Sequence, residues 1–240
     1  MSPQLSLRQV KTAFLDLLLP LRCLSCGREG YLIRPSCRLS LPRIKFPLCQ
    51  RCGATVSEGN LCHSCLNYPL AIDGIRSAFL FQGIVRQAVL QFKYRHLKAL
   101  AVQLSELIAE FLSSYPLKGE VLIPVPLYPK RLRQRGYNEA TLLATELGKL
   151  ISLPVEDNIL VRVKDAMPQA RTRSAAERRL NVYDAFACHQ SLEGKQILLI
   201  DDVCTTGSTL DACARALKAA GSGSVWGLTV AREMFSSSSK

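Results

Sequence analysis

Residues 196–221, QILLIDDVCTTGSTLDACARALKAAG, carry the strongest structural signal in the chain. The run 197–200 is short, apolar and rich in β-branched residues, which predicts a buried parallel strand that stops at Asp201 and Asp202. A helix is expected after it, because Leu210, Ala214 and Leu217 form an apolar stripe with helical spacing. Gly221 is expected to end this helix. Strand, polar turn and helix in this order favour a Rossmann-like α/β fold with its chemistry at the carboxyl end of the strand.

The turn between strand and helix has the composition of a phosphate site. Hydroxyl groups, a permissive glycine and closely spaced N–H groups come together at Thr205, Thr206, Gly207, Ser208 and Thr209. A helix N-terminus favours an anion by about 0.3–1 kcal/mol per interaction. The two adjacent aspartates would repel a phosphate, but they suit the vicinal hydroxyls of a ribose. The pattern therefore predicts a ribose 5-phosphate ligand, with Cys204 as a small buried filler and not a nucleophile.

The N-terminal third is rich in cysteine. Seven of the ten cysteines precede residue 66, and two C-x-x-C pairs stand close together: Cys49, Cys52, Cys62 and Cys65. This is the spacing of a zinc ribbon, in which four thiolates hold one structural ion. Such binding stabilises a segment by about 10–16 kcal/mol. A second set is incomplete, because only Cys37 follows Cys23 and Cys26, and Arg34 stands where a fourth cysteine would; we expect at most a weak second site there.

The rest of the chain alternates strand and helix signals from Ile72 onward, which predicts a mainly parallel sheet flanked by helices. Strands are expected near 75–81, 121–125, 182–186 and 224–230, and helices near 84–92, 97–112 and 137–150. We therefore divide the chain into an N-terminal helix (1–22), a cysteine-rich zinc-ribbon module (23–70), an α/β domain that carries the candidate site (71–235) and a disordered tail (236–240). The N-terminal apolar stretch is too short to span a bilayer, so we expect a cytoplasmic protein.

Two basic segments form the second functional signal. The first follows a predicted strand and carries Lys130, Arg131, Arg133 and Arg135; the second resembles a mobile lid and carries Arg171, Arg173, Arg178 and Arg179. Guanidinium groups with Mg²⁺ would neutralise a pyrophosphate leaving group. A solvated basic face is the alternative interpretation. The formal charge of +12 in 240 residues also favours an anionic partner without identifying it.

The 201–209 segment closely resembles the phosphoribosyl-diphosphate (PRPP) signature of type I phosphoribosyltransferases. Together with the two C-x-x-C pairs, Phe92-Lys93-Tyr94, PVP followed by RGYN, and PQ followed by RRLN, it is similar to the ComF family of competence-associated proteins. The resemblance implies that PRPP is held by Asp201, Asp202, Val203, Cys204, Thr205, Thr206, Gly207, Ser208 and Thr209, with Asp201 and Asp202 as catalytic residues on the ribose. It also implies structural Zn²⁺, Mg²⁺ with PRPP, and a role in natural transformation beside single-stranded DNA and competence-machinery proteins.

Two classes of function follow. The first is a PRPP-binding, phosphoribosyltransferase-like protein of DNA uptake or DNA metabolism, whose acceptor no motif encodes. The second is a non-catalytic module that binds single-stranded nucleic acid, using Tyr94, Tyr128 and Tyr137 beside the basic residues and keeping the PRPP site as a sensor or relic. A nucleotide-salvage enzyme fits poorly with the cysteine module. A glutamine amidotransferase would need an N-terminal nucleophilic cysteine, and the chain begins Met1-Ser2.

Overall fold

The computed structural model describes residues 21–95, 97–164 and 184–233, and the chain divides into two compact units, Met1–Leu41 and Pro42–Lys240. Within the smaller unit, a tight turn at Cys23–Gly27 precedes the short helix α2 (Pro35–Arg38), which begins on a proline. The expected helix over 1–22 lies outside the described residues except for its last two positions. The expected tail at 236–240 lies outside them altogether.

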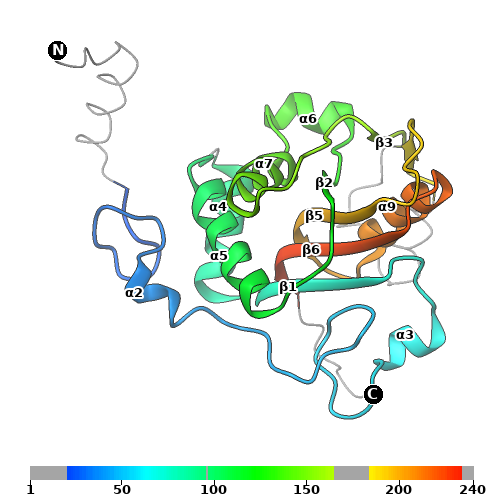
Figure 1. Cartoon of the computed structure of the whole chain (residues 1–240). Coiled ribbons are helices and arrows are strands. Elements are labelled where there is room, and N and C mark those ends of the chain that lie inside the picture. The colour runs from blue at the N-terminus through cyan, green and yellow to red at the C-terminus, as the bar shows by residue number, and fades with distance from the viewer. Residues whose placement is uncertain (1–20, 96, 165–183, 234–240) are drawn as a thin grey trace. The chain divides into compact units, whose positions relative to one another are not determined.

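A four-stranded parallel sheet forms the centre of the larger unit, in the order β1 (Gly74–Leu80), β6 (Ser224–Arg232), β5 (Gln196–Cys204) and β2 (Val121–Pro124) (Figure 1). The predicted mainly parallel sheet is confirmed. The strand expected to stop at the aspartates runs further, because β5 keeps pairing with β6 through Val203 and Cys204. Asp201 and Asp202 are therefore held in a ladder and not in a loop.

Helices cover both faces of this sheet. On one face lie α4 (Gly83–Tyr94), α5 (Leu100–Ser114) and α7 (Glu139–Ile151), and on the other lies α9 (Ser208–Ala219) (Figure 1). Apolar residues of α9 share a core with the strand residues Ile197 and Leu199. Within the part of the chain that the structure describes, no helix is long and apolar enough to cross a membrane.

Two segments differ from the expectation. The first basic segment, predicted as a loop, forms the helix α6 (Pro129–Arg135), which starts on a proline and ends at Gly136 with φ of 75°. A proline at the start and a glycine just past the end favour a helix. The strand expected near 182–186 appears as β4 (Phe186–Cys188), which pairs antiparallel with β3 (Leu160–Arg162), a strand that the sequence pattern did not indicate.

The four-cysteine cluster, Cys49, Cys52, Cys62 and Cys65, belongs to the larger unit. Its first knuckle turns at Gly53, and its second knuckle opens the short helix α3 (His63–Asn67). The knuckle lies against the sheet: the Ile75 N–H donates to the Arg51 carbonyl at 2.7 Å, and the Arg51 guanidinium donates to the Ile72 carbonyl at 3.0 Å. The boundaries expected at 22/23 and 70/71 rest on composition and stay predictions.

Candidate functional site

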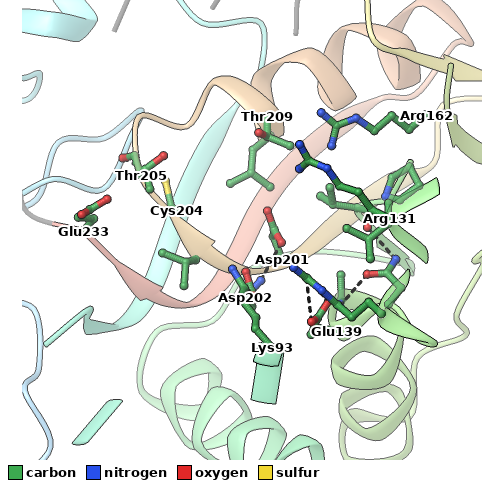
Figure 2. A pocket seen from close by; sticks show the side chains of 18 of the residues that line it. Lys93, Arg131, Glu139, Arg162, Asp201, Asp202, Cys204, Thr205, Thr209 and Glu233 are labelled. Atoms are coloured by element: carbon green, nitrogen blue, oxygen red, sulfur yellow. Dashed lines mark hydrogen bonds and ion pairs between the residues drawn. The ribbon is translucent and has the colours of Figure 1, made fainter. Parts of the chain in front are cut away.

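A cavity of about 770 Å³ opens at the carboxyl end of β5, within the range of small-molecule sites. Residues from β5, the following turn, α4, α6 and α7 line it, and Figure 2 shows Asp201 and Asp202 at its centre. In this view the acid pair lies between Lys93 and the turn residues Thr205 and Thr209. The cavity therefore has an acidic centre with a hydroxyl-rich turn on one side and a cation on the other.

The turn after β5 has the conformation of an anion site. Gly207 adopts φ of 81°, which favours glycine, and it precedes the first residue of α9, Ser208. The Thr206 hydroxyl accepts a hydrogen bond from the Ser208 N–H at 3.3 Å and lies 2.7 Å from the Ser208 hydroxyl. Thr205, Gly207, Ser208 and Thr209 line the cavity, whereas Thr206 does not. Thr206 thus stabilises the turn at the start of α9.

Lys93 is a site residue to which the sequence analysis assigned no role. Its Nζ lies 2.8 Å from Oδ2 of Asp202, at the last turn of α4. Burial lowers the pKa of Lys93, but the two aspartates outweigh burial and raise it, so the ammonium group stays charged. Burial, with the neighbouring Asp202, raises the pKa of Asp201 to about 7. The Phe92-Lys93-Tyr94 motif was the signal that could have found this residue.

The basic helix α6 sends two of its four cations to the cavity. Arg131 and Arg135 line it, while Lys130 and Arg133 are exposed residues that do not. Arg135 donates to both carboxylate oxygens of Glu139, at 2.9 and 3.0 Å, and lies 5.5 Å from the Tyr94 ring. Arg162 of β3 also lines the cavity, unforeseen because β3 was not predicted. The lid arginines 171, 173, 178 and 179 lie outside the described residues.

Cys204 is the last residue of β5 and lies within the 201–209 segment that is predicted to bind PRPP. It is buried, and burial raises the pKa of its thiol to about 11, so at neutral pH the sulfur is protonated and a poor nucleophile. The buried position agrees with its interpretation as a small filler. Tyr137 is also buried, and its hydroxyl donates to the Phe92 carbonyl, so this tyrosine is not placed to stack on a base.

Both cysteine sets come together in space as the spacing predicted. Within each set, the sulfur atoms lie within 4.8 Å of one another. The first set is Cys49, Cys52, Cys62 and Cys65, and the other is Cys23, Cys26 and Cys37. The sulfurs of Cys52 and Cys62 are 3.7 Å apart. Thiolates around a tetrahedral zinc at about 2.3 Å are separated by about 3.8 Å. The four-cysteine set therefore fits a structural zinc, and the three-cysteine set offers one ligand fewer.

Family comparisons agree with this geometry. The double zinc ribbon domain matches residues 14–66, and the phosphoribosyl transferase domain matches residues 132–233. Competence protein F of Haemophilus influenzae is 32% identical over 220 residues, which cover 86% of this chain and 96% of the relative. The chain belongs to the ComF family. Its fold is the phosphoribosyltransferase fold with an N-terminal double zinc ribbon, so both expectations are confirmed.

Other ComF relatives are similar over most of their length. Competence protein ComFC of Bacillus subtilis is 30% identical, with 79% of this chain and 82% of the relative covered. The DNA utilization protein YhgH of Escherichia coli O157:H7 is 28% identical, with 74% and 81% covered. In this ComF chain the segment 201–209, which resembles the PRPP signature, supplies the acid pair and the hydroxyl-rich turn of the cavity.

Proposed function

We propose that this ComF protein binds PRPP with Mg²⁺ in the cavity at the end of β5 and transfers the phosphoribosyl group to an acceptor during the handling of DNA. The observation that carries the proposal is the placement of Asp201 and Asp202 beside the Thr205–Thr209 turn in one cavity. A diol and a phosphate, joined as they are in ribose 5-phosphate, need these two groups side by side.

Each part of PRPP has a complementary group in this site. The two aspartates accept hydrogen bonds from the ribose 2′ and 3′ hydroxyls, and the turn with the start of α9 binds the 5-phosphate. Arg131 lines the same cavity and would face the diphosphate. Carboxylate and diphosphate oxygens are ligands that suit Mg²⁺, which would add positive charge beside the leaving group.

The transfer is a displacement at C1 of the ribose. The acceptor atom forms its bond to C1, the bond from C1 to the diphosphate oxygen breaks, and pyrophosphate leaves with the bonding electrons. Positive charge develops on the sugar and negative charge on the leaving group, so the neighbouring carboxylates and the Arg131 guanidinium each stabilise the charge that they face. The lid arginines 171, 173 and 178 would join the pyrophosphate side, as would Lys130 and Arg133 after a rearrangement of α6.

The link to DNA rests on the relatives and on charge. Relatives are named competence and DNA utilization proteins, and the formal charge of +12 suits a nucleic-acid partner. Clustered cysteines that hold zinc as thiolates are typical of proteins in a reducing compartment, so we place this protein in the cytoplasm. Single-stranded DNA and competence-machinery proteins are the partners we propose.

Calorimetric titration of the zinc-loaded protein with PRPP and Mg²⁺ tests the proposal. The double variant Asp201→Asn/Asp202→Asn should bind PRPP at least about 100-fold more weakly, because hydrogen bonds to charged groups contribute about 1.5–3 kcal/mol each. Lys149→Met, an exposed change on α7, is the control. Pyrophosphate release with candidate acceptors then tests transfer. A wild-type protein that binds no PRPP would contradict the proposal.

A further inference from the structure

Arg232, the last residue of β6, lies between two parts of the molecule. One is the metal-binding knuckle, Cys49–Cys52, and the other is the turn Thr205–Thr209, which we call the phosphate turn. The Arg232 guanidinium donates through Nη1 to the Cys52 carbonyl and to the Cys204 sulfur, the latter at 3.2 Å. Cys52 belongs to the four-thiolate set, and Cys204 ends the strand that carries the acid pair. Arg232 is 6% exposed, so its charge depends on these protein partners. One buried side chain thus contacts both sites.

The backbone packing supports the same link. Gly53, the residue after Cys52, lies so close to β1 that a Cβ there would be 2.4 Å from the Ile75 carbonyl oxygen. Gly207, in the phosphate turn, is also close to Ile75: a Cβ on Gly207 would be 2.8 Å from Cδ1 of Ile75. Ile75 is fully buried between them. The knuckle, β1 and the phosphate turn are therefore closely packed against one another.

Arg76 and Arg51 clamp the knuckle to the sheet without reaching the phosphate turn. Arg76 donates to the Gln50 carbonyl at 3.1 Å, and Arg51 donates to the Ile72 carbonyl at 3.0 Å. Of these three arginines, the described contacts give Arg232 alone a hydrogen bond to the strand end that leads into the phosphate turn. Arg51 lies between two of the zinc ligands, so the exposed change Lys149→Met on α7 serves as the control.

We infer that the metal-loaded knuckle positions the phosphate turn through Arg232, so that zinc occupancy of Cys49, Cys52, Cys62 and Cys65 controls PRPP affinity. The inference rests on the proposed function for its ligand. Arg232 is a positioning residue: it orders Cys204 and the turn after it and does not line the cavity. Loss of the metal frees the Cys52 turn, Arg232 loses the fixed carbonyl, and the 204–209 segment loosens.

The first arm of the test measures amide hydrogen exchange in the full-length protein, with zinc and after chelation. In both the chelated wild type and Arg232→Met, exchange across 204–209 should accelerate about tenfold or more, while α7 exchanges as before. Lys149→Met should exchange like the wild type across 204–209, and Arg232→Lys, which keeps one donor, should be intermediate. Equal acceleration in α7 and in the turn, or no acceleration in the turn, would overturn the inference. This arm needs no PRPP.

The second arm measures coupling between the two ligands. Arg232→Met should weaken PRPP binding about tenfold while one zinc stays tightly bound, and Lys149→Met should stay within about twofold. Because coupling is reciprocal, PRPP should tighten zinc binding of the wild type by the same factor by which zinc tightens PRPP binding. PRPP affinity that is independent of zinc would overturn the link. A wild type that binds no PRPP contradicts the proposed function, and the exchange arm then decides the positioning role by itself.

Discussion

Two of the carboxylates that line the cavity are paired with cations. Asp202 pairs with Lys93 at 2.8 Å, and Glu139, also buried, pairs with Arg135 at 2.9 Å. A buried carboxylate without a partner would be destabilising by several kcal/mol, so these pairs are what allow an acidic centre to stay folded before a ligand arrives. The carboxylate of Asp201 accepts a hydrogen bond from the Asp202 N–H instead.

Lys93 should contribute to PRPP binding through this pairing. Lys93→Met leaves the acid pair without its ammonium partner and removes a cation from a site for a highly charged anion. We expect PRPP to bind about tenfold more weakly, or roughly 1.4 kcal/mol, with Lys93→Arg close to the wild type. Calorimetry measures the affinity, and Lys149→Met is the exposed control. Unchanged affinity in Lys93→Met would show that Lys93 only balances charge in the free protein.

PRPP affinity should also depend on the ionisation of Asp201, whose pKa burial raises to about 7. The ionised carboxylate accepts hydrogen bonds from ribose hydroxyls, so binding should strengthen as pH rises through 7 and level off above it. Near pH 6 only about a tenth of Asp201 is ionised, which predicts affinity about tenfold below that at pH 8. Titrations at several pH values measure the step. Asp201→Asn should lack it, and an identical step in that variant would assign it to the phosphates of the ligand.

At the scale of elements, the turn between β5 and α9 contains Gly207, where both the backbone conformation and the packing restrict which side chain fits. Gly207 has φ of 81°, and a Cβ there would meet Ile75 at 2.8 Å; Gly194 has φ of 80°, and a Cβ there would meet nothing within 4 Å. The two glycines share the backbone restriction and differ in the contact. They form a natural pair for separating strain from packing.

Gly207→Ala should lower the free energy of unfolding by about 2–3 kcal/mol, and Gly194→Ala by about 1 kcal/mol, because only the first adds a clash to the backbone strain. Urea denaturation measures both values. PRPP affinity should fall in Gly207→Ala alone, since the turn must move to admit the methyl group. Equal losses of stability in the two variants would mean that the turn yields freely beside Ile75.

At the scale of the whole molecule, the described residues form two thiol clusters, one in each compact unit, and the clusters differ in their number of ligands. Cys23, Cys26 and Cys37 leave a tetrahedral ion one thiolate short. The backbone N–H of Arg34 lies 3.5 Å from the Cys23 sulfur, so residue 34 is beside the cluster. A thiolate introduced at this position would therefore start close to the cluster.

Metal analysis after mild chelation should return one tightly held zinc per chain in the wild type, from the four-cysteine cluster. Arg34→Cys adds the fourth thiolate and should raise the count to two, and Cys62→Ser should lower the wild-type count. Atomic absorption with competition by a graded chelator measures the stoichiometry. Two zincs held with equal strength by the wild type would show that three thiolates suffice.

The sequence alone determined the features that depend on local pattern. Hydrophobic periodicity indicated β1, β2, β5 and β6. The spacing of the cysteines indicated which of them form the two sulfur clusters. The PRPP signature lies in one continuous segment, so its acid pair and turn were visible without the fold. The helix α6 was readable too, because Pro129 and Gly136 bracket it, but its high arginine content suggested a loop.

Only the tertiary structure decided which distant residues join those segments. Lys93 reaches Asp202 from a helix more than a hundred positions earlier, Arg162 comes from a strand with no pattern of its own, and Arg232 joins Cys52 to Cys204. These contacts depend on strand order and on the register of β6 between β1 and β5. Local sequence does not encode that register, because it is set by packing of the whole sheet against its helices and the cysteine knuckle.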